Sequence, residues 1–196
     1  MKKFVFGLLA VVTSVLIYFA AVNSRAATET APFTVVKAAG EFELRQYEEM
    51  HLARTPMGAG IHNDEARDSS FIRLFRYISG TNEREEKIAM TTPVLMSSEE
   101  GYTAMNFVMP KATAVAGAPR PKPGVSLEKL PPMKVVAVRF SGVSSLEAEA
   151  RQLARLKEWA ASERLSLHGQ PLIAYYDPPW TPGFLRRNEV LMRVKE

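Results

Sequence analysis

The residues with the greatest capacity for chemistry are few and widely spaced. The three histidines, His51, His62 and His168, show neither the HExxH pattern nor the spacing of a facial triad. The serines lie in polar stretches without the GxSxG pattern of a nucleophile elbow. The chain contains no cysteine, which excludes thiolate catalysis, disulfides and cysteine-ligated metals. No motif here indicates a catalytic or metal centre.

The run KIAMTTPVLM, residues 87–96, is more unusual. Proline has no N–H to donate to a sheet, and thioethers pack softly, so a rigid core strand needs neither. Met90, Thr91 and Pro93 could therefore line a groove for a flat apolar ligand. They could equally be the irregular end of a strand that packs on a helix.

Composition indicates one globular domain preceded by a leader. The chain has 196 residues, 46% of them hydrophobic and 23% charged. Three of its 25 basic residues, Lys2, Lys3 and Arg25, lie in the first 26 residues, which contain no acid, so the rest carries 22 basic against 21 acidic residues. A nearly neutral body gives no reason to expect nucleic-acid binding.

Residues 1–26 have the pattern of an export signal. Lys2 and Lys3 precede an apolar stretch over 4–22, and Ser24 and Ala26 occupy the −3 and −1 positions of a cleavage site. The stretch is also long enough to cross a bilayer once. We expect either a cleaved signal or an uncleaved single-span membrane anchor. Both place the domain at 33–196 in the periplasm or another extracytoplasmic space, after a tether at 27–32.

The order strand, helix, strands occurs twice along the domain. It predicts an α+β fold in which a curved, mostly antiparallel sheet carries two helices. Serine 144 with Glu147 predicts a capping box for the second helix. The expected strands are 33–37, 42–57, the KIAMTTPVLM run, 102–109, 133–140, 172–176 and 188–194, the expected helices are 64–79 and 145–163, and 111–124 is an expected loop.

Periodicity assigns side chains to faces. Regular alternation along the strand from Phe42 would place Arg45, Tyr47 and His51 on one face, unless a bulge after Glu48 breaks it. The first helix has an apolar stripe at i, i+3, i+4 and i+7, formed by Phe71, Leu74, Phe75 and Ile78.

The stretch FIRLFRYISGTNEREEKIAMTTPV, residues 71–94, resembles the SOUL heme-binding family. ELRQY at 43–47, RFSG at 139–142 and AYYDPPW…RRNEV at 174–190 agree with it, so the resemblance covers nearly all of 33–194. It implies a distorted, mostly antiparallel β-barrel of two similar halves, each with one helix packed outside. It also implies binding of heme or a related tetrapyrrole in an apolar groove beside the first helix, and no generally established catalytic activity.

On this resemblance we expect a groove formed by residues of the first long strand, the first helix and the KIAMTTPVLM run. Arg45, with Arg73 and Arg76 on the helix, could pair with heme propionates or be ordinary surface charges. The expected binding residues are Arg45, Tyr47, His51, Phe71, Leu74, Phe75, Ile78, Met90, Thr91 and Pro93.

One departure from the family concerns the iron. Some members carry a histidine between the Arg and Tyr of the first long strand, where this chain has Gln46. His51 is the nearest substitute. It is either a heme-iron ligand or a surface or partly buried histidine.

The expected function is that of an exported, non-enzymatic protein that sequesters or transports a tetrapyrrole. Two alternatives remain open. A hydrolase would need a buried carboxylate beside an aromatic hydroxyl, for which Glu43 or Glu189 with Tyr47 or Tyr102 are the candidates. The other alternative is an envelope interaction protein that binds no tetrapyrrole.

Overall fold

A computed structural model of the chain describes residues 28–58, 60–99, 102–178 and 180–195. The predicted leader, residues 1–26, lies outside the described residues. Among the helices that are described, none has the length and apolar character needed to cross a membrane. Residues 29–30, expected in the tether, form the short strand β1.

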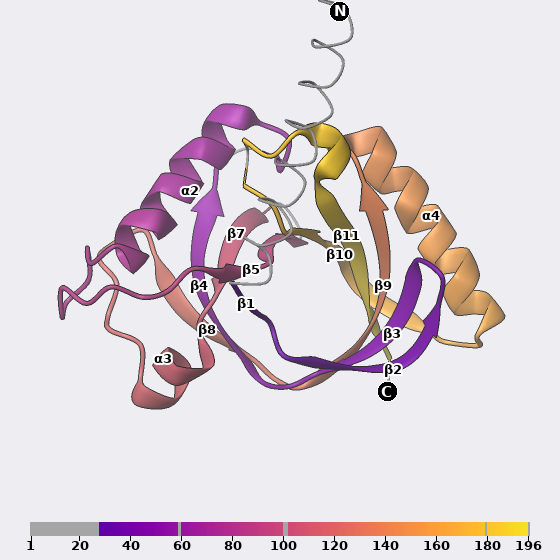
Figure 1. Ribbon diagram of the computed structural model, residues 1–196, viewed down its shortest axis with the longest axis horizontal. Helices are drawn as coiled ribbons and strands as arrows, with labels where there is room; N and C mark the ends of the chain where they lie inside the picture. Colours follow the sequence, from indigo (N-terminus) through magenta and orange to yellow (C-terminus); the bar gives the residue numbers. More distant parts are fainter. Residues whose placement is uncertain (1–27, 59, 100–101, 179, 196) are drawn as a thin grey trace, which may run out of the picture.

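Nine strands form one antiparallel sheet with two helices packed on its outer face (Figure 1). A separate two-stranded parallel ladder joins β1 (Glu29–Thr30) to β5 (Thr91–Thr92). In spatial order the large sheet contains β2 (Phe33–Ala39), β3 (Phe42–Tyr47), β9 (Met133–Ser141), β11 (Arg187–Val194), β10 (Leu167–Tyr175), β6 (Val94–Glu99), β7 (Tyr102–Val108), β4 (Met50–Met57) and β8 (Ser126–Leu130).

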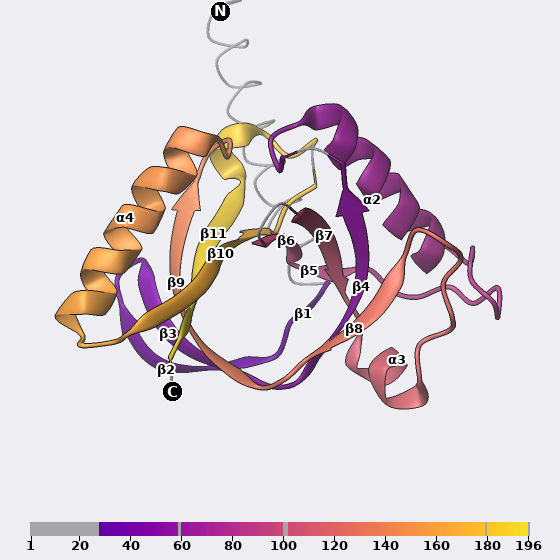
Figure 2. The ribbon, with the colours of Figure 1, turned by 180° about the vertical axis from the view of Figure 1, so that it is seen from behind.

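The sheet curls because two pairs of strands continue into one another. β3 and β4 are separated by only two residues, as are β8 and β9, and the first pair runs antiparallel to the second from Phe42↔Val138 to Arg54↔Ser126. The curvature is visible from both sides (Figures 1 and 2). The sheet does not close, so the predicted distorted barrel is confirmed as a partial one.

The two predicted halves are present. In one half, β4, helix α2 (Asp64–Ile78), β6 and β7 follow in sequence, and the strands lie in the order β6-β7-β4. In the other, β9, helix α4 (Leu146–Ser162), β10 and β11 follow, and the strands lie in the order β10-β11-β9. Pairing of β6 with β10 joins the halves.

Each face of the sheet has its own apolar cluster. On the outer face, Leu74 of α2 and Leu156 of α4 are fully buried against sheet residues such as Met105 and Val138. Burial of each leucine contributes roughly 1.5–3 kcal/mol. The inner face carries a second cluster that includes Tyr47 and Leu191. The core therefore consists of two apolar layers, one on each face of the same sheet.

Some local predictions need correction. The cap of α4 is Ser145, whose Oγ accepts a hydrogen bond from the Ala148 amide at 3.2 Å, and not Ser144 with Glu147. Ser144 instead donates to Glu149, because that carboxylate lies one turn into the helix. The expected loop 111–124 begins with a short helix, α3 (Lys111–Ala116). β10 begins five residues earlier than expected, because a bulge between His168 and Leu172 lets the strand continue past an irregular stretch.

Candidate functional site

Helix α2 begins with a side-chain cap. Asn63 precedes it in extended conformation, and its Oδ1 accepts from the Ala66 amide at 2.8 Å. Asp64 and Glu65 in the first turn complement the positive end of the helix dipole. The helix therefore starts at Asp64, where the sequence predicts it.

The buried side of α2 is rotated from the predicted stripe. Ser70, Leu74, Tyr77 and Ile78 face the sheet, at i, i+4, i+7 and i+8. Phe75 is 49% exposed, so this member of the predicted apolar stripe does not pack on the sheet. Tyr77 takes that position because its hydroxyl donates to the Pro119 carbonyl at 2.9 Å. Burial raises the pKa of Tyr77 to about 12, so the phenol stays protonated near neutrality.

The rotation leaves apolar surface uncovered on one flank of α2. Phe71 stacks on Phe75 with ring centroids 5.8 Å apart, and it makes an edge contact with Phe107 of β7 at 5.5 Å. Ile72 lies next to Phe75 along the helix and is 47% exposed. These side chains present an apolar flank made of Ile72 and Phe75, with Phe71 beneath Phe75.

The arginines of α2 differ in availability. Arg73 donates to the Thr55 hydroxyl and the Pro56 carbonyl at 3.0 and 2.9 Å, and also to Ser70. Arg76 is exposed, and its guanidinium makes no hydrogen bond or ion pair with the residues that the structure describes. It lies one helical turn from Ile72. Arg76 is thus the helix arginine that is positioned to meet a ligand carboxylate.

A buried asparagine organises the turn after α2. The Asn82 amide nitrogen donates to the carbonyls of Tyr77 and Glu86 at 3.0 and 2.7 Å, and its Oδ1 accepts from the amides of Arg84 and Glu86. Gly80 has φ +107°, a conformation that favours glycine. The YISGTN motif therefore builds the turn and directs the chain back along the helix.

The KIAMTTPVLM run takes several roles. The Ile88 amide donates to the Ile78 carbonyl at 2.8 Å, which places this segment beside the last turn of α2. Thr91 is buried and donates to the Val108 carbonyl, and the Thr92–Pro93 bond is cis. Pro93 is buried on the inner face beside Tyr47. Met90 is 36% exposed. Only Met90 of these predicted residues offers substantial surface to a ligand.

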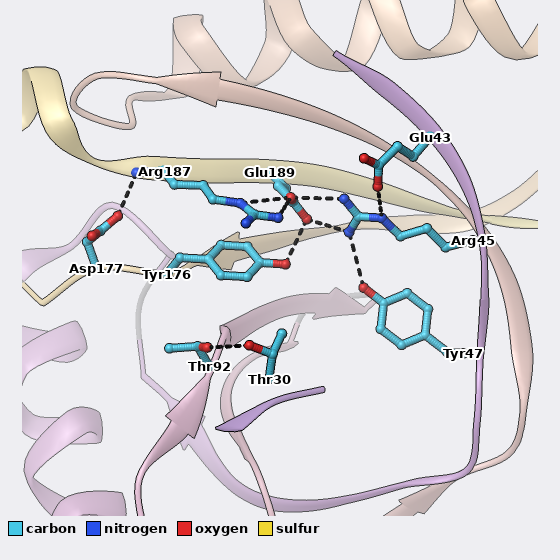
Figure 3. A network of polar contacts seen from close by, with 9 residues as sticks. All are labelled: Thr30, Glu43, Arg45, Tyr47, Thr92, Tyr176, Asp177, Arg187 and Glu189. Carbon is cyan, nitrogen blue, oxygen red and sulfur yellow. Dashed lines mark hydrogen bonds and ion pairs between the residues drawn. The ribbon is translucent and has the colours of Figure 1, made fainter. Parts of the chain in front are cut away.

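Arg45 lies at the centre of a buried polar network on the inner face (Figure 3). Its two terminal nitrogens donate to Glu189 at 2.6 and 3.0 Å, and its Nε donates to Glu43 at 2.7 Å. Tyr47 accepts from Arg45 at 3.3 Å, and Tyr176 donates to Glu189 at 2.8 Å.

The network keeps both charges. Burial by itself would raise the pKa of Glu189, but hydrogen bonds and positive charge from Arg45 and Arg187 outweigh it and hold this pKa below its usual value. Burial opposes the charge of Arg45, yet Glu189 raises the pKa of the guanidinium further. For Tyr176, burial followed by the negative Glu189 raises the pKa well above its usual value. The network therefore contains charged Arg45 and Glu189 between two protonated phenols. The Arg45 guanidinium is hydrogen-bonded to Glu189 and does not face solvent.

The histidines are scattered in the structure as in the sequence. The alternation of faces breaks between Tyr47 and Met50, because Arg45 and Tyr47 face inward and so do Met50 and Leu52. The break is not the bulge considered after Glu48, since the pairs Tyr47↔Met133 and Met50↔Leu130 continue one register. His51 therefore does not share the face of Arg45, and its Nε2 lies 2.9 Å from Glu49. His62 is 3.0 Å from Glu149, and His168 is exposed. Within the described ranges, no three His, Cys, Asp or Glu side chains gather as a metal site would require.

The ten predicted binding residues thus fall into separate groups. Phe71, Leu74, Phe75 and Ile78 share α2, and only the first and third offer surface on the apolar flank. Arg45, Tyr47 and Pro93 lie on the inner face of the sheet. Binding of a ligand by these ten residues stays a prediction.

Comparison with known proteins identifies the family. A model described as SOUL heme-binding protein matches residues 28–193. The chain belongs to the SOUL heme-binding protein family. It is 27% identical over 160 residues to heme-binding protein 1 of Xenopus laevis, covering 76% of this chain and 81% of that protein. Heme-binding protein 1 of Xenopus tropicalis is 28% identical over the same length and coverage.

Solved structures share the fold of this SOUL protein at low identity. The C-terminal domain of EcmrR superimposes with a TM-score of 0.61 at 11% identity, covering 79% of this chain and 97% of that domain. A hydrolase from Listeria innocua gives 0.53 at 11% identity, covering 82% and 94%. At these identities the likeness shows the fold alone.

Sequence reasoning missed one further feature of the inner face. A cavity there is lined by polar side chains at inward positions of otherwise apolar strands, among them Ser97, Asn106 and Arg193. The available signal was a single polar residue between large apolar ones, as in Met105-Asn106-Phe107 and Met192-Arg193-Val194. Alternation along a strand predicts which face such a residue lies on. It does not predict whether a cavity lies next to that residue.

Proposed function

We propose that this SOUL protein is an exported, non-enzymatic protein that binds heme or a related tetrapyrrole, for sequestration or transport. The observation that carries the proposal is the apolar flank of α2 in a chain of the heme-binding family. Ile72 and Phe75 are each about half exposed although a helix normally buries such side chains. The relatives named heme-binding protein 1 support the same ligand class.

The described residues suit the macrocycle better than they suit its metal. A flat porphyrin can lie against Phe75 and Ile72, with Met90 in the segment beside the end of α2, and it can bury several hundred Å² in doing so. Arg76 can hold a propionate by a forked hydrogen bond. The imidazole of His51 is already paired with Glu49, with Nε2 2.9 Å from that carboxylate. Heme, when bound, would supply the chemistry of its own iron.

The arrangement of Glu189 supports a binding role over the hydrolase alternative. This carboxylate receives five hydrogen bonds, from Arg45, Arg187 and Tyr176. Such a carboxylate is held as a charged acceptor and is a poor proton acceptor. Of the other alternative residues, Glu43 pairs with Arg45, and Tyr102 lies under the Arg54 guanidinium at 5.2 Å.

Titration of the purified full-length protein with hemin tests the ligand class. We expect a saturable change of the Soret band at micromolar hemin. Combined replacement Ile72→Ser and Phe75→Ser should weaken binding about tenfold or more, because both side chains lose apolar contact with the ring. The matched control is Phe184→Ser, which removes an aromatic ring that is 75% exposed far along the chain. A flat response of the wild-type protein would contradict the proposal.

Export is supported by the leader sequence and is tested separately. Fractionation of cells that express the full chain should recover the protein outside the cytosol. N-terminal sequencing and carbonate extraction then distinguish a signal cleaved after Ala26 from a retained anchor. Recovery in the cytosolic fraction would contradict export and leave the hemin result untouched.

A further inference from the structure

The inner face of the sheet contains a cavity of about 440 Å³. Its lining comes from six neighbouring strands, β8, β4, β7, β6, β10 and β11, so the curvature of the sheet creates it. Leu52, Leu95 and Leu172 line it and belong to the inner apolar cluster, whereas α2 packs on the opposite face. The volume lies in the range of pockets for small organic ligands.

One wall of the cavity depends on the bulge in β10. Pairing of β10 with β11 shifts register between His168 and Leu172, and Gly169 and Gln170 within the shift line the cavity. Gly169 has φ +74°, which favours glycine. The bulge between His168 and Leu172 therefore forms part of the cavity wall. The same bulge lies just before the residue where the sequence predicts that β10 begins.

A buried acceptor in the cavity lining has no donor. Asn106 is 2% exposed, and its amide nitrogen donates to the Leu95 carbonyl at 3.0 Å and to Ser97 Oγ at 3.2 Å. These bonds fix the nitrogen on that side. Among the residues described, none donates to Asn106 Oδ1. Buried polar atoms are nearly always hydrogen-bonded, so this oxygen indicates a missing partner.

The described lining of the cavity includes two arginines and one acid. Arg54 pairs with the acid, Glu128, at 2.9 Å, and the second arginine is Arg193. The Arg193 guanidinium is half-buried on β11 and makes no hydrogen bond or ion pair with any residue in the described ranges. An arginine at the edge of an apolar pocket is suited to a carboxylate.

We propose that this cavity is a second ligand site, which binds a small amphipathic organic acid carrying an N–H or O–H donor. The acid group meets Arg193 and the apolar body lies on the leucines. The donor reaches Asn106 Oδ1 after side chains of the cavity wall move aside, because that oxygen is buried in the structure. The site is separate from the α2 flank, so the acid and a tetrapyrrole bind together. The proposal does not depend on tetrapyrrole binding.

Two dyes that differ by one group test the site. 1-Anilinonaphthalene-8-sulfonate has an anion, an N–H donor and an apolar body, and N-phenyl-1-naphthylamine lacks only the anion. Calorimetric titration of the full-length protein should show one sulfonate site that Arg193→Met weakens about tenfold or more and Arg193→Lys largely retains. The neutral dye should bind more weakly and be indifferent to Arg193→Met.

The matched control is Arg139→Met, which removes an exposed arginine from the neighbouring strand β9. It should leave sulfonate binding unchanged. Equal affinity of the sulfonate for wild type and Arg193→Met would overturn the proposal, because the dye would then bind apolar surface without contacting Arg193. One-to-one competition between hemin and the sulfonate would also overturn it, since the cavity would then be the tetrapyrrole site. A separate Soret titration reports on tetrapyrrole binding itself.

Discussion

At the scale of single residues, the Arg45–Glu189 pair is the most demanding feature of the inner face. Arg45 lies on β3 and Glu189 on β11, with β9 between them in the sheet. Both are almost fully buried, so each charge depends on the other for compensation. The pair links strands that are not neighbours, and it therefore helps to hold the curvature on which both halves depend.

Replacement of Glu189 by Gln should destabilise the protein by about 3 to 5 kcal/mol, because it leaves the buried Arg45 undercompensated. Urea unfolding measures the loss. Glu163→Gln is the control, since Glu163 pairs with the half-exposed Lys37 and should cost less than about 1 kcal/mol. Equal losses of unfolding free energy in the two variants would show that the buried pair stabilises the protein no more than a surface pair does.

The same pair predicts the acid dependence of stability. The folded-state pKa of Glu189 lies below the value of 4.5 that applies when the chain is unfolded. The contribution of Glu189 is therefore present above about pH 4.5 and is lost as the pH falls toward the folded-state pKa. The difference in unfolding free energy between wild type and Glu189→Gln should shrink below pH 4.5. A constant difference down to about pH 3 would contradict this.

At the scale of elements, the turn after α2 decides where the helix ends. Asn82 is 3% exposed, and its side chain bonds four backbone groups of the turn. Without it, the carbonyls of Tyr77 and Glu86 would lose these donors. The turn also returns the chain so that Ile88 joins the end of the helix, which positions the segment that carries Met90.

Asn82→Ala should therefore lower the free energy of unfolding by about 2 to 3 kcal/mol. Asn63→Ala removes one cap bond at the other end of α2 and should cost about 1 kcal/mol. Thermal or urea unfolding compares the two variants. If Asn82→Ala cost no more than the cap variant, the turn would not have the structural role given to it here.

Element order and the two-half architecture could be predicted, because periodicity of 2 and 3.6 is local and strong in this chain. The exact buried side of α2 could not, since Phe75 and Tyr77 compete and a distant carbonyl, that of Pro119, decides between them. Arg45 and Glu189 are 144 positions apart, so their pairing depends on sheet order. The cavity arises from curvature and a bulge, and a pattern of side-chain types encodes neither.

At the scale of the whole molecule, one sheet serves two surfaces. Its outer face is covered by the helices (Figure 1). α2 leaves an apolar flank beside Arg76, whose guanidinium has no partner among the described residues. Its inner face holds the charged network (Figure 3), and it also holds the cavity. We propose that a tetrapyrrole lies on the α2 flank, outside the partial barrel.

The most direct test is a map of backbone amide shifts on adding gallium protoporphyrin to the full-length, nitrogen-labelled protein. Gallium is diamagnetic and the macrocycle keeps its propionates, so nearby amides shift without being lost. We predict that the largest changes fall on Ile72, Phe75, Arg76 and the segment around Met90. Changes concentrated instead at Ser97, Asn106 and Arg193 would place the macrocycle in the inner cavity and contradict the claim.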